Sequence, residues 1–153
     1  TMHLLQYVLR EAVRTGTGKS VYYTLDKDFD VAGKTGTTND GRDSWFAGFS
    51  GDLLAVTWIG RDDNGITGLT GATGALQIWK EFMRTAARRS LVYRMPEGVE
   101  AHWVDEYTST VTDGSCENSI LLPFISGTQP AEYSSCKKKD SAKKSWFQSL
   151  FGR

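Results

Sequence analysis

The residues of this sequence best suited to chemistry form one short segment, Lys34-Thr35-Gly36-Thr37. In an extended strand side chains alternate, so Thr35 and Thr37 point one way and Lys34 points the other. Two hydroxyls and nearby backbone N–H groups on one edge can hold a carboxylate and a developing oxyanion. Gly36 lets a neighbouring element or a substrate approach the backbone closely. The same four residues also fit an ordinary edge strand with a glycine kink, so their surroundings must decide.

Other short patterns match functional motifs only in part. Gly18-Lys19-Ser20 and Gly33-Lys34-Thr35 resemble the end of a phosphate-binding loop. The glycine that this loop needs five positions earlier is Val13 in the first case and Asp28 in the second. We therefore predict no nucleotide site.

Metal sites are not predicted either. Asp26, Asp28 and Asp30 alternate as in a calcium loop, but the glycine and glutamate required further along are missing, so a solvated turn or strand edge is the better interpretation. His3 and His102 are far apart and have no cysteine or carboxylate at ligand spacing. We expect no metal and no cofactor.

The overall composition is that of a globular chain: 153 residues, of which 39% are hydrophobic. The formal net charge is zero, but residues 137–153 hold six of the 18 basic residues and one of the 18 acidic residues. A nucleic-acid partner is not expected from this balance. No apolar run is long enough to span a membrane, and the start lacks the pattern of a signal peptide. Because it begins almost inside a helix, we expect a C-terminal piece of a longer protein.

Three strands are predicted, at Val31–Thr37, Ser44–Phe49 and Leu53–Ile59. Turn-forming segments at Asn39–Gly41 and Ser50–Asp52 separate them, which favours an antiparallel meander. The third run is long and apolar enough to be a central strand packed on both faces.

Two helices are predicted beside these strands. An apolar stripe at helical spacing predicts the first over 4–13, ending near Thr15–Gly18, where glycine is the usual C-cap. After a glycine-rich loop (Gly65, Gly68, Gly71, Gly74) the second is expected at about Ala75–Arg88. Helices on an antiparallel sheet form an α+β layer, which we assign to residues 1–95.

Residues 96–136 are predicted to form a small strand-and-loop appendage. Its short runs at His102–Val104 and Ile120–Ile125 are broken by turn signals at Asp113-Gly114 and by Pro123. Cys116 and Cys136 are the only cysteines of the chain. From the residues alone, one disulfide and two buried thiols fit equally well.

Residues 137–153 form a basic amphipathic tail. Ser145 is a plausible N-cap for a short helix with one aromatic and apolar face, made of Trp146, Phe147, Leu150 and Phe151. A helix this short is marginal alone in water. We expect a disordered tail that docks on an anionic membrane surface or in a protein groove. An inert solubilising tail is the alternative.

The surroundings of Lys34 carry a family resemblance. Val31–Asp40, followed by Asp43–Phe49, resembles the third active-site motif of penicillin-binding transpeptidases. The likeness continues through Trp58–Asp62, Gly71–Ala75, Pro96–Val99 and the segment from Cys116 to Cys136. It is greatest to the class A bifunctional penicillin-binding proteins, particularly their 1b type. It implies a C-terminal fragment of the transpeptidase region, with a penicillin-binding/serine β-lactamase-like fold.

This family sets three motifs in the order S-x-x-K, S-x-N and K-T-G, with the nucleophilic serine in the first. The chain has no S-x-N, and its only S-x-x-K matches begin at Ser134, Ser135 and Ser141, after the K-T-G. We reject these serines as nucleophiles and expect the isolated fragment to be inactive. The missing N-terminal part of the same protein would carry the nucleophile, the glycosyltransferase and the membrane anchor.

The resemblance also implies roles for individual residues in a serine-type D,D-transpeptidase. Lys34 would help to organise proton transfer and substrate charge. The hydroxyls of Thr35 and Thr37 would bind a carboxylate of the peptide stem or of a β-lactam. The Thr37 backbone N–H would form half of the oxyanion hole. The substrate site would further include Gly36, Thr38 and Trp45.

Location and partners follow from the same resemblance. It implies the periplasmic face of the bacterial inner membrane, where Cys116 and Cys136 would form a disulfide. The expected partners are peptidoglycan stem peptides, β-lactam antibiotics, the missing N-terminal part and, for the tail, a periplasmic activator or a membrane surface. Two alternatives are a piece of a serine β-lactamase-like hydrolase and a non-catalytic periplasmic interaction module.

Overall fold

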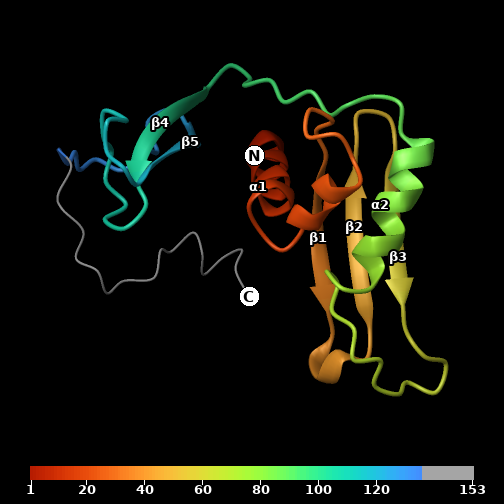
Figure 1. Cartoon of the computed structure of the whole chain (residues 1–153). Coiled ribbons are helices and arrows are strands. Elements are labelled where there is room, and N and C mark those ends of the chain that lie inside the picture. Colours follow the sequence, from red (N-terminus) through yellow and green to blue (C-terminus); the bar gives the residue numbers. More distant parts are fainter. Residues whose placement is uncertain (136–153) are drawn as a thin grey trace. The chain divides into compact units, whose positions relative to one another are not determined.

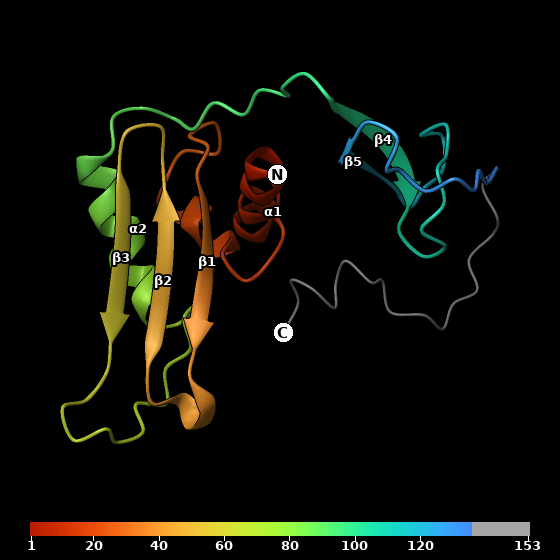
Figure 2. The ribbon, with the colours of Figure 1, turned by 180° about the vertical axis from the view of Figure 1, so that it is seen from behind.

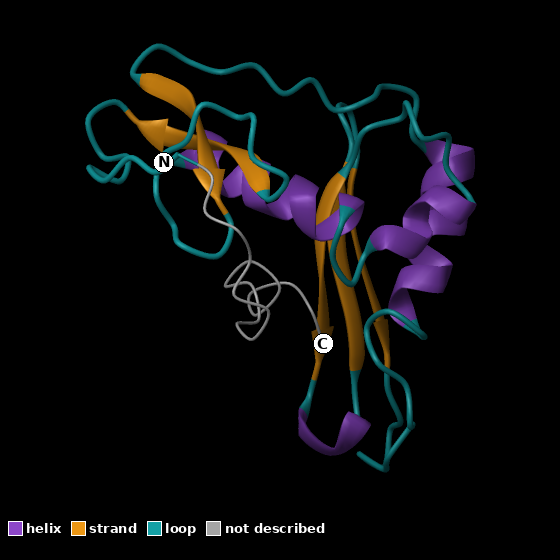
Figure 3. Cartoon of the chain, turned by 60° about the vertical axis from the view of Figure 1, so that its left-hand side comes forward, coloured by secondary structure: helices purple, strands orange, loops and turns teal. Residues whose placement is uncertain are grey.

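The computed structural model, which describes residues 1–135, contains two compact units. The larger is Gln6–Tyr93, and the smaller joins Thr1–Leu5 with the described residues from Arg94 onward. The larger unit has a three-stranded sheet with helices and the smaller a two-stranded sheet, both antiparallel (Figures 1 and 3). The predicted α+β class is confirmed.

The sheet of the larger unit is the predicted meander. Its strands are β1 (Ala32–Thr37), β2 (Ser44–Phe49) and β3 (Leu54–Ile59), in the order β1-β2-β3. A short 3-10 turn, η2 (Asn39–Gly41), joins β1 to β2, and Asp40 and Gly41 have φ values of 62° and 63° there. This left-handed turn brings Thr37 opposite Ser44 in the register of the two strands.

Three helical segments accompany the sheet: α1 (Met2–Arg14), η1 (Lys19–Tyr23) and α2 (Ala75–Ala86). Helix α2 covers one face of β2 and β3 (Figure 1). On the other face, seen from behind in Figure 2 and called the bare face below, the described side chains of Trp45, Leu54, Val56 and Trp58 are exposed. The core lies under this helix, where the rings of Phe46 and Trp79 meet edge to face at 4.8 Å.

Helix α1 ends at Arg14 because the chain turns back sharply on its last turn. The Gly18 N–H donates to the Ala12 carbonyl at 3.0 Å. A β-carbon at Gly18 would lie 3.0 Å from the Val13 Cα, closer than nearly all real contacts. Glycine therefore permits the reversal that leads into η1.

The expectation that the third apolar run is a central strand packed on both faces is wrong. Within residues 1–135, β3 pairs only with β2 and forms an edge of the sheet. Its side chains alternate, and Leu54, Val56 and Trp58 are 69%, 55% and 48% exposed. The run is apolar on both faces, but α2 covers only one of them.

The smaller unit contains β4 (Val99–Asp105) and β5 (Ser119–Ile125), paired from Val99↔Ile125 to Asp105↔Ser119. Pro123 does not break β5, contrary to the sequence prediction, and lies opposite Ala101. In a two-stranded sheet each strand is an edge, where a proline need not donate to a neighbour.

Two predictions fall partly or wholly outside the described residues. Cys116 lies in the smaller unit and is buried, but Cys136 is not described, so the disulfide stays a prediction. The tail 137–153 also lies outside the described part. Within residues 1–135, no helix combines the length and apolarity needed to cross a bilayer.

Candidate functional site

Strand β1 presents a backbone edge that is not used by the sheet. Among the described residues its only neighbouring strand is β2. The Thr38 N–H donates to the Asp43 carbonyl at 3.2 Å. Because the ladder of an antiparallel pair alternates, the N–H groups of Thr35 and Thr37 then point away from β2. The free edge thus offers the backbone donor of Thr37.

The Lys34 side chain leaves the opposite face of the strand but returns over this edge. Its Nζ donates to the Thr35 carbonyl at 3.0 Å and to the Thr35 Oγ at 3.1 Å. The alternation of side chains along a strand predicts the face on which the Lys34 side chain starts. It does not predict that this long side chain bends back over the edge of β1. A positive charge and a hydroxyl therefore meet at the edge.

The hydroxyls of Thr35 and Thr37 lie on the face that the helices cover. Thr35 Oγ lies 2.7 Å from Thr17 Oγ, in the turn after α1. Thr37 Oγ accepts a hydrogen bond from the Gly71 N–H at 2.9 Å. Sequence reasoning singled out neither Thr17 nor Gly71 for the site. Both lie in glycine-containing turns, and Gly71 also belongs to the segment Gly71–Ala75 of the family resemblance, but neither signal reveals what the two residues contact.

The other predicted site residues are placed differently. Thr38 closes the β1–β2 turn, since its Oγ accepts the Asp43 N–H at 2.8 Å. Trp45 pairs with Gly36 across the strands and lies on the face opposite the two threonine hydroxyls, with its ring 6.0 Å from that of Trp58. The structure thus brings Lys34, Thr35 and Thr37 together, and places Trp45 on the other side of the sheet.

An open hollow of about 520 Å³ lies next to this group rather than on it. The turn before η1 and the start of α2 line it, with hydroxyls from Thr17, Ser20 and Thr73. Its connection to β1 runs through the contact between Thr17 and Thr35. Within residues 1–135, no cluster of three or more potential metal ligands occurs.

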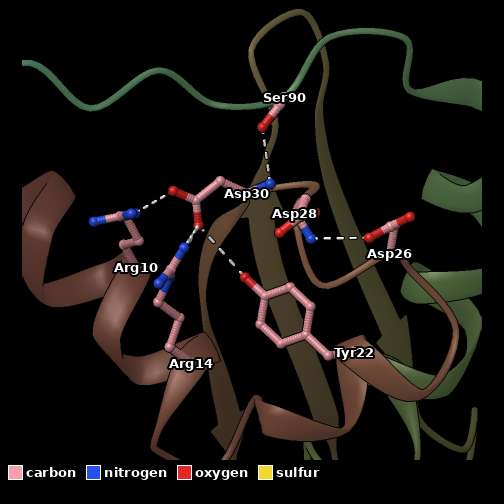
Figure 4. A network of polar contacts seen from close by, with 7 residues as sticks. All are labelled: Arg10, Arg14, Tyr22, Asp26, Asp28, Asp30 and Ser90. Carbon is pink, nitrogen blue, oxygen red and sulfur yellow. Dashed lines mark hydrogen bonds and ion pairs between the residues drawn. The ribbon is translucent and has the colours of Figure 1, made fainter.

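A partly buried ion-pair network holds the segment that leads into β1 (Figure 4). Arg10 and Arg14, one turn apart on α1, both bind the carboxylate of Asp30, the latter at 3.1 Å. The Asp30 backbone N–H donates to Ser90 Oγ at 2.8 Å. The prediction of a solvated turn or edge is therefore wrong for Asp30, which is 7% exposed. Two arginines from a distant helix supply the partners that water would otherwise provide.

The charges of this network shift the pKa values of its members. Burial of Arg14 opposes its charge, but the hydrogen bond and the charge of Asp30 outweigh this and raise its pKa. Burial, together with the charge of Asp30, raises the pKa of Tyr22, whose hydroxyl lies 3.5 Å from the carboxylate. Asp30 thus ties α1 to the strand that carries the candidate site.

Comparisons with known proteins show which proteins this chain resembles. No family model matches it. It is 34% identical to penicillin-binding protein 1B of Vibrio cholerae over 151 residues, and this alignment covers 97% of this chain and 18% of the relative. It is 39% identical to penicillin-binding protein 1B of Haemophilus influenzae over 121 residues, and this alignment covers 77% of this chain and 14% of the relative.

A solved structure agrees with these relatives. The crystal structure of penicillin-binding protein 1A from Haemophilus influenzae matches with a TM-score of 0.75 at 26% identity, over 86% of this chain and 21% of that chain. The chain therefore spans only about a fifth of the length of the proteins that it resembles.

Proposed function

Because this chain belongs to the class A penicillin-binding proteins, we propose that it completes the transpeptidase site of a bifunctional glycosyltransferase/transpeptidase. The reaction is a serine acyl transfer that cross-links peptidoglycan stem peptides. A serine of the missing N-terminal part attacks the stem carbonyl, the peptide bond at that carbonyl breaks, the residue on its amine side leaves, and an acyl-enzyme ester remains. An acceptor amine then attacks the ester carbonyl and takes the acyl group, and the serine hydroxyl is restored. A β-lactam is attacked by the same serine.

The chain contributes one wall of this site. The Thr37 N–H donates to the oxyanion that develops on the attacked carbonyl, and the hydroxyls of Thr35 and Thr37 bind the carboxylate of the substrate. Lys34 supplies positive charge and helps to organise proton transfer. One oxyanion donor is typically worth about 10²–10³ in rate. The free edge of β1, where the Lys34 Nζ contacts Thr35, is the observation that carries this proposal.

The bare face of the sheet supports a partner within the same protein. Its exposed apolar side chains are Trp45, Leu54, Val56 and Trp58. Contiguous apolar surface of this kind marks a contact face. Since the chain matches a fifth of its relatives' length, we propose that the N-terminal part of the same protein covers this face.

The proposed location is the periplasmic face of the inner membrane. An oxidising compartment would allow Cys116 and Cys136 to form a disulfide. The tail 137–153 would meet a periplasmic activator or the membrane surface there.

Labelling with a fluorescent penicillin tests the function. The full-length protein that contains this chain should form a covalent adduct, whereas the chain alone should keep its intact mass. A stable adduct on a serine of the isolated chain would contradict its role as one wall. A folded full-length protein that is never labelled would leave a non-catalytic interaction module as the better account.

A further inference from the structure

The loop before α2 is fastened directly behind the strand ends of β1 and β2. Ser44, the register partner of Thr37, is fully buried. Its Oγ donates to the Thr70 carbonyl at 2.7 Å and accepts the Ala75 N–H at 2.8 Å. One hydroxyl thus holds both ends of the turn 70–75 against the sheet.

Gly71, the second residue of this turn, lies against the backbone of both strands. A β-carbon there would lie 2.6 Å from the Trp45 carbonyl oxygen, 2.7 Å from that of Gly36 and 2.8 Å from the Thr35 Cβ. Real β-carbons essentially never approach other atoms within 3.0 Å, and none of these three atoms ends a flexible side chain. Any side chain at Gly71 must therefore move β1, β2 or the loop.

The same glycine also orients a hydroxyl of the site. The Gly71 N–H donates to Thr37 Oγ at 2.9 Å. A threonine hydroxyl has one proton and two lone pairs. When one lone pair accepts from Gly71, the proton remains available to donate to another group. The loop thus presents Thr37 as a hydrogen-bond donor, which is the role that a carboxylate ligand requires.

We propose that Gly71 and Ser44 are positioning residues for the site, which hold Thr35 and Thr37 in place from behind. This inference rests on the proposed transpeptidase function of β1. Neither residue touches the substrate; both act through the two threonines. Displacements of about 1 Å can cost about 10²-fold in rate, so a small shift of β1 is enough to matter.

The test measures β-lactam acylation kinetics of the full-length protein. Gly71→Ala should lower the second-order acylation rate by about 10–100-fold. Ser44→Ala, which adds no clash, should lower it in the same direction by a smaller factor. The matched control is Gly48→Ala, whose β-carbon would lie 2.8 Å from both Phe46 Cε1 and Trp79 Cζ2 in the core, and 3.0 Å from the carbonyl oxygen of Ala32, at the opposite end of β1 from Thr37. It should reduce thermal stability and leave the acylation rate close to that of the wild type.

A double variant that combines Gly71→Ala with Thr37→Val tests whether Gly71 affects acylation through Thr37. If Gly71 acts through Thr37, the double variant should lose less than the product of the two single losses. Two results would overturn the inference. One is an equal loss of acylation rate in Gly71→Ala and Gly48→Ala at matched stability. The other is a double variant, Gly71→Ala with Thr37→Val, whose loss equals the product of the two single losses. Failure of the wild type itself to be labelled would instead contradict the proposed function. If Gly71→Ala does not fold, Ser44→Ala compared with Gly48→Ala decides the same question.

Discussion

The larger unit packs a cluster of fully buried apolar side chains between its sheet and helices, whereas the smaller unit has a two-stranded sheet and few buried residues. The cluster includes Val13, Phe46, Leu76 and Trp79. Among the residues of the smaller unit that the structure describes, the buried ones are Val104, Asp105, Thr112, Cys116 and Leu122. An isolated two-stranded sheet is marginal in water. The first unit can thus hold a site rigidly by packing, while the second must depend more on hydrogen bonds and, if it forms, on the predicted disulfide.

The largest effect should come from the core of the larger unit. Phe46→Ala removes a fully buried ring against Trp79 and should lower the free energy of unfolding by about 3–5 kcal/mol. Leu54→Ala, on the bare face of the same sheet, is the matched control and should change it by less than about 0.5 kcal/mol. Urea denaturation of this chain by itself measures both, because the proposed N-terminal cover would bury Leu54 in the full-length protein. Similar losses for the two variants would contradict the assignment of one packed face and one bare face.

The proposed disulfide should come next, with an effect confined to the smaller unit. A link from Cys116 to Cys136 closes a loop of about 20 residues and should stabilise it by about 3 kcal/mol. Cys116→Ser should therefore speed hydrogen exchange in β4 and β5 and leave β1–β3 unchanged. Cys136→Ser and the double variant should behave identically to it. Two free thiols in protein exported to the periplasm would refute the link.

The smallest of the three effects concerns a buried turn in the smaller unit. The Asp105 carboxylate, 8% exposed, accepts the N–H groups of Tyr107 at 3.0 Å and Thr108 at 2.8 Å. Asp105→Ala leaves these donors without their partner and should cost about 1–2 kcal/mol. Asp113 makes the same kind of turn contact to the Ser115 N–H while exposed to water. Asp113→Ala should have little effect, and equal losses would show that burial does not matter here.

Local patterns in the sequence were enough to predict the main elements of the larger unit. Short runs of residues between turn segments predicted β1 and β2, and the stripe of apolar residues predicted α1 and α2, because these signals act between residues close in the chain. The predicted helix at 75–88 ends two residues earlier, at Ala86. The family motif at Lys34–Thr37 was likewise visible, since its residues are consecutive.

Tertiary structure alone decided which residues support that motif. Gly71 donates to Thr37 across 34 positions, and Asp30 donates to Ser90 across 60 positions. The exposure of β3 was decided in the same way, because an apolar strand becomes central only if other chain segments cover both of its faces. The sequence by itself determined the elements and the reactive segment. Long-range packing determined how this segment is held, since contacts between distant positions leave no local periodicity to detect.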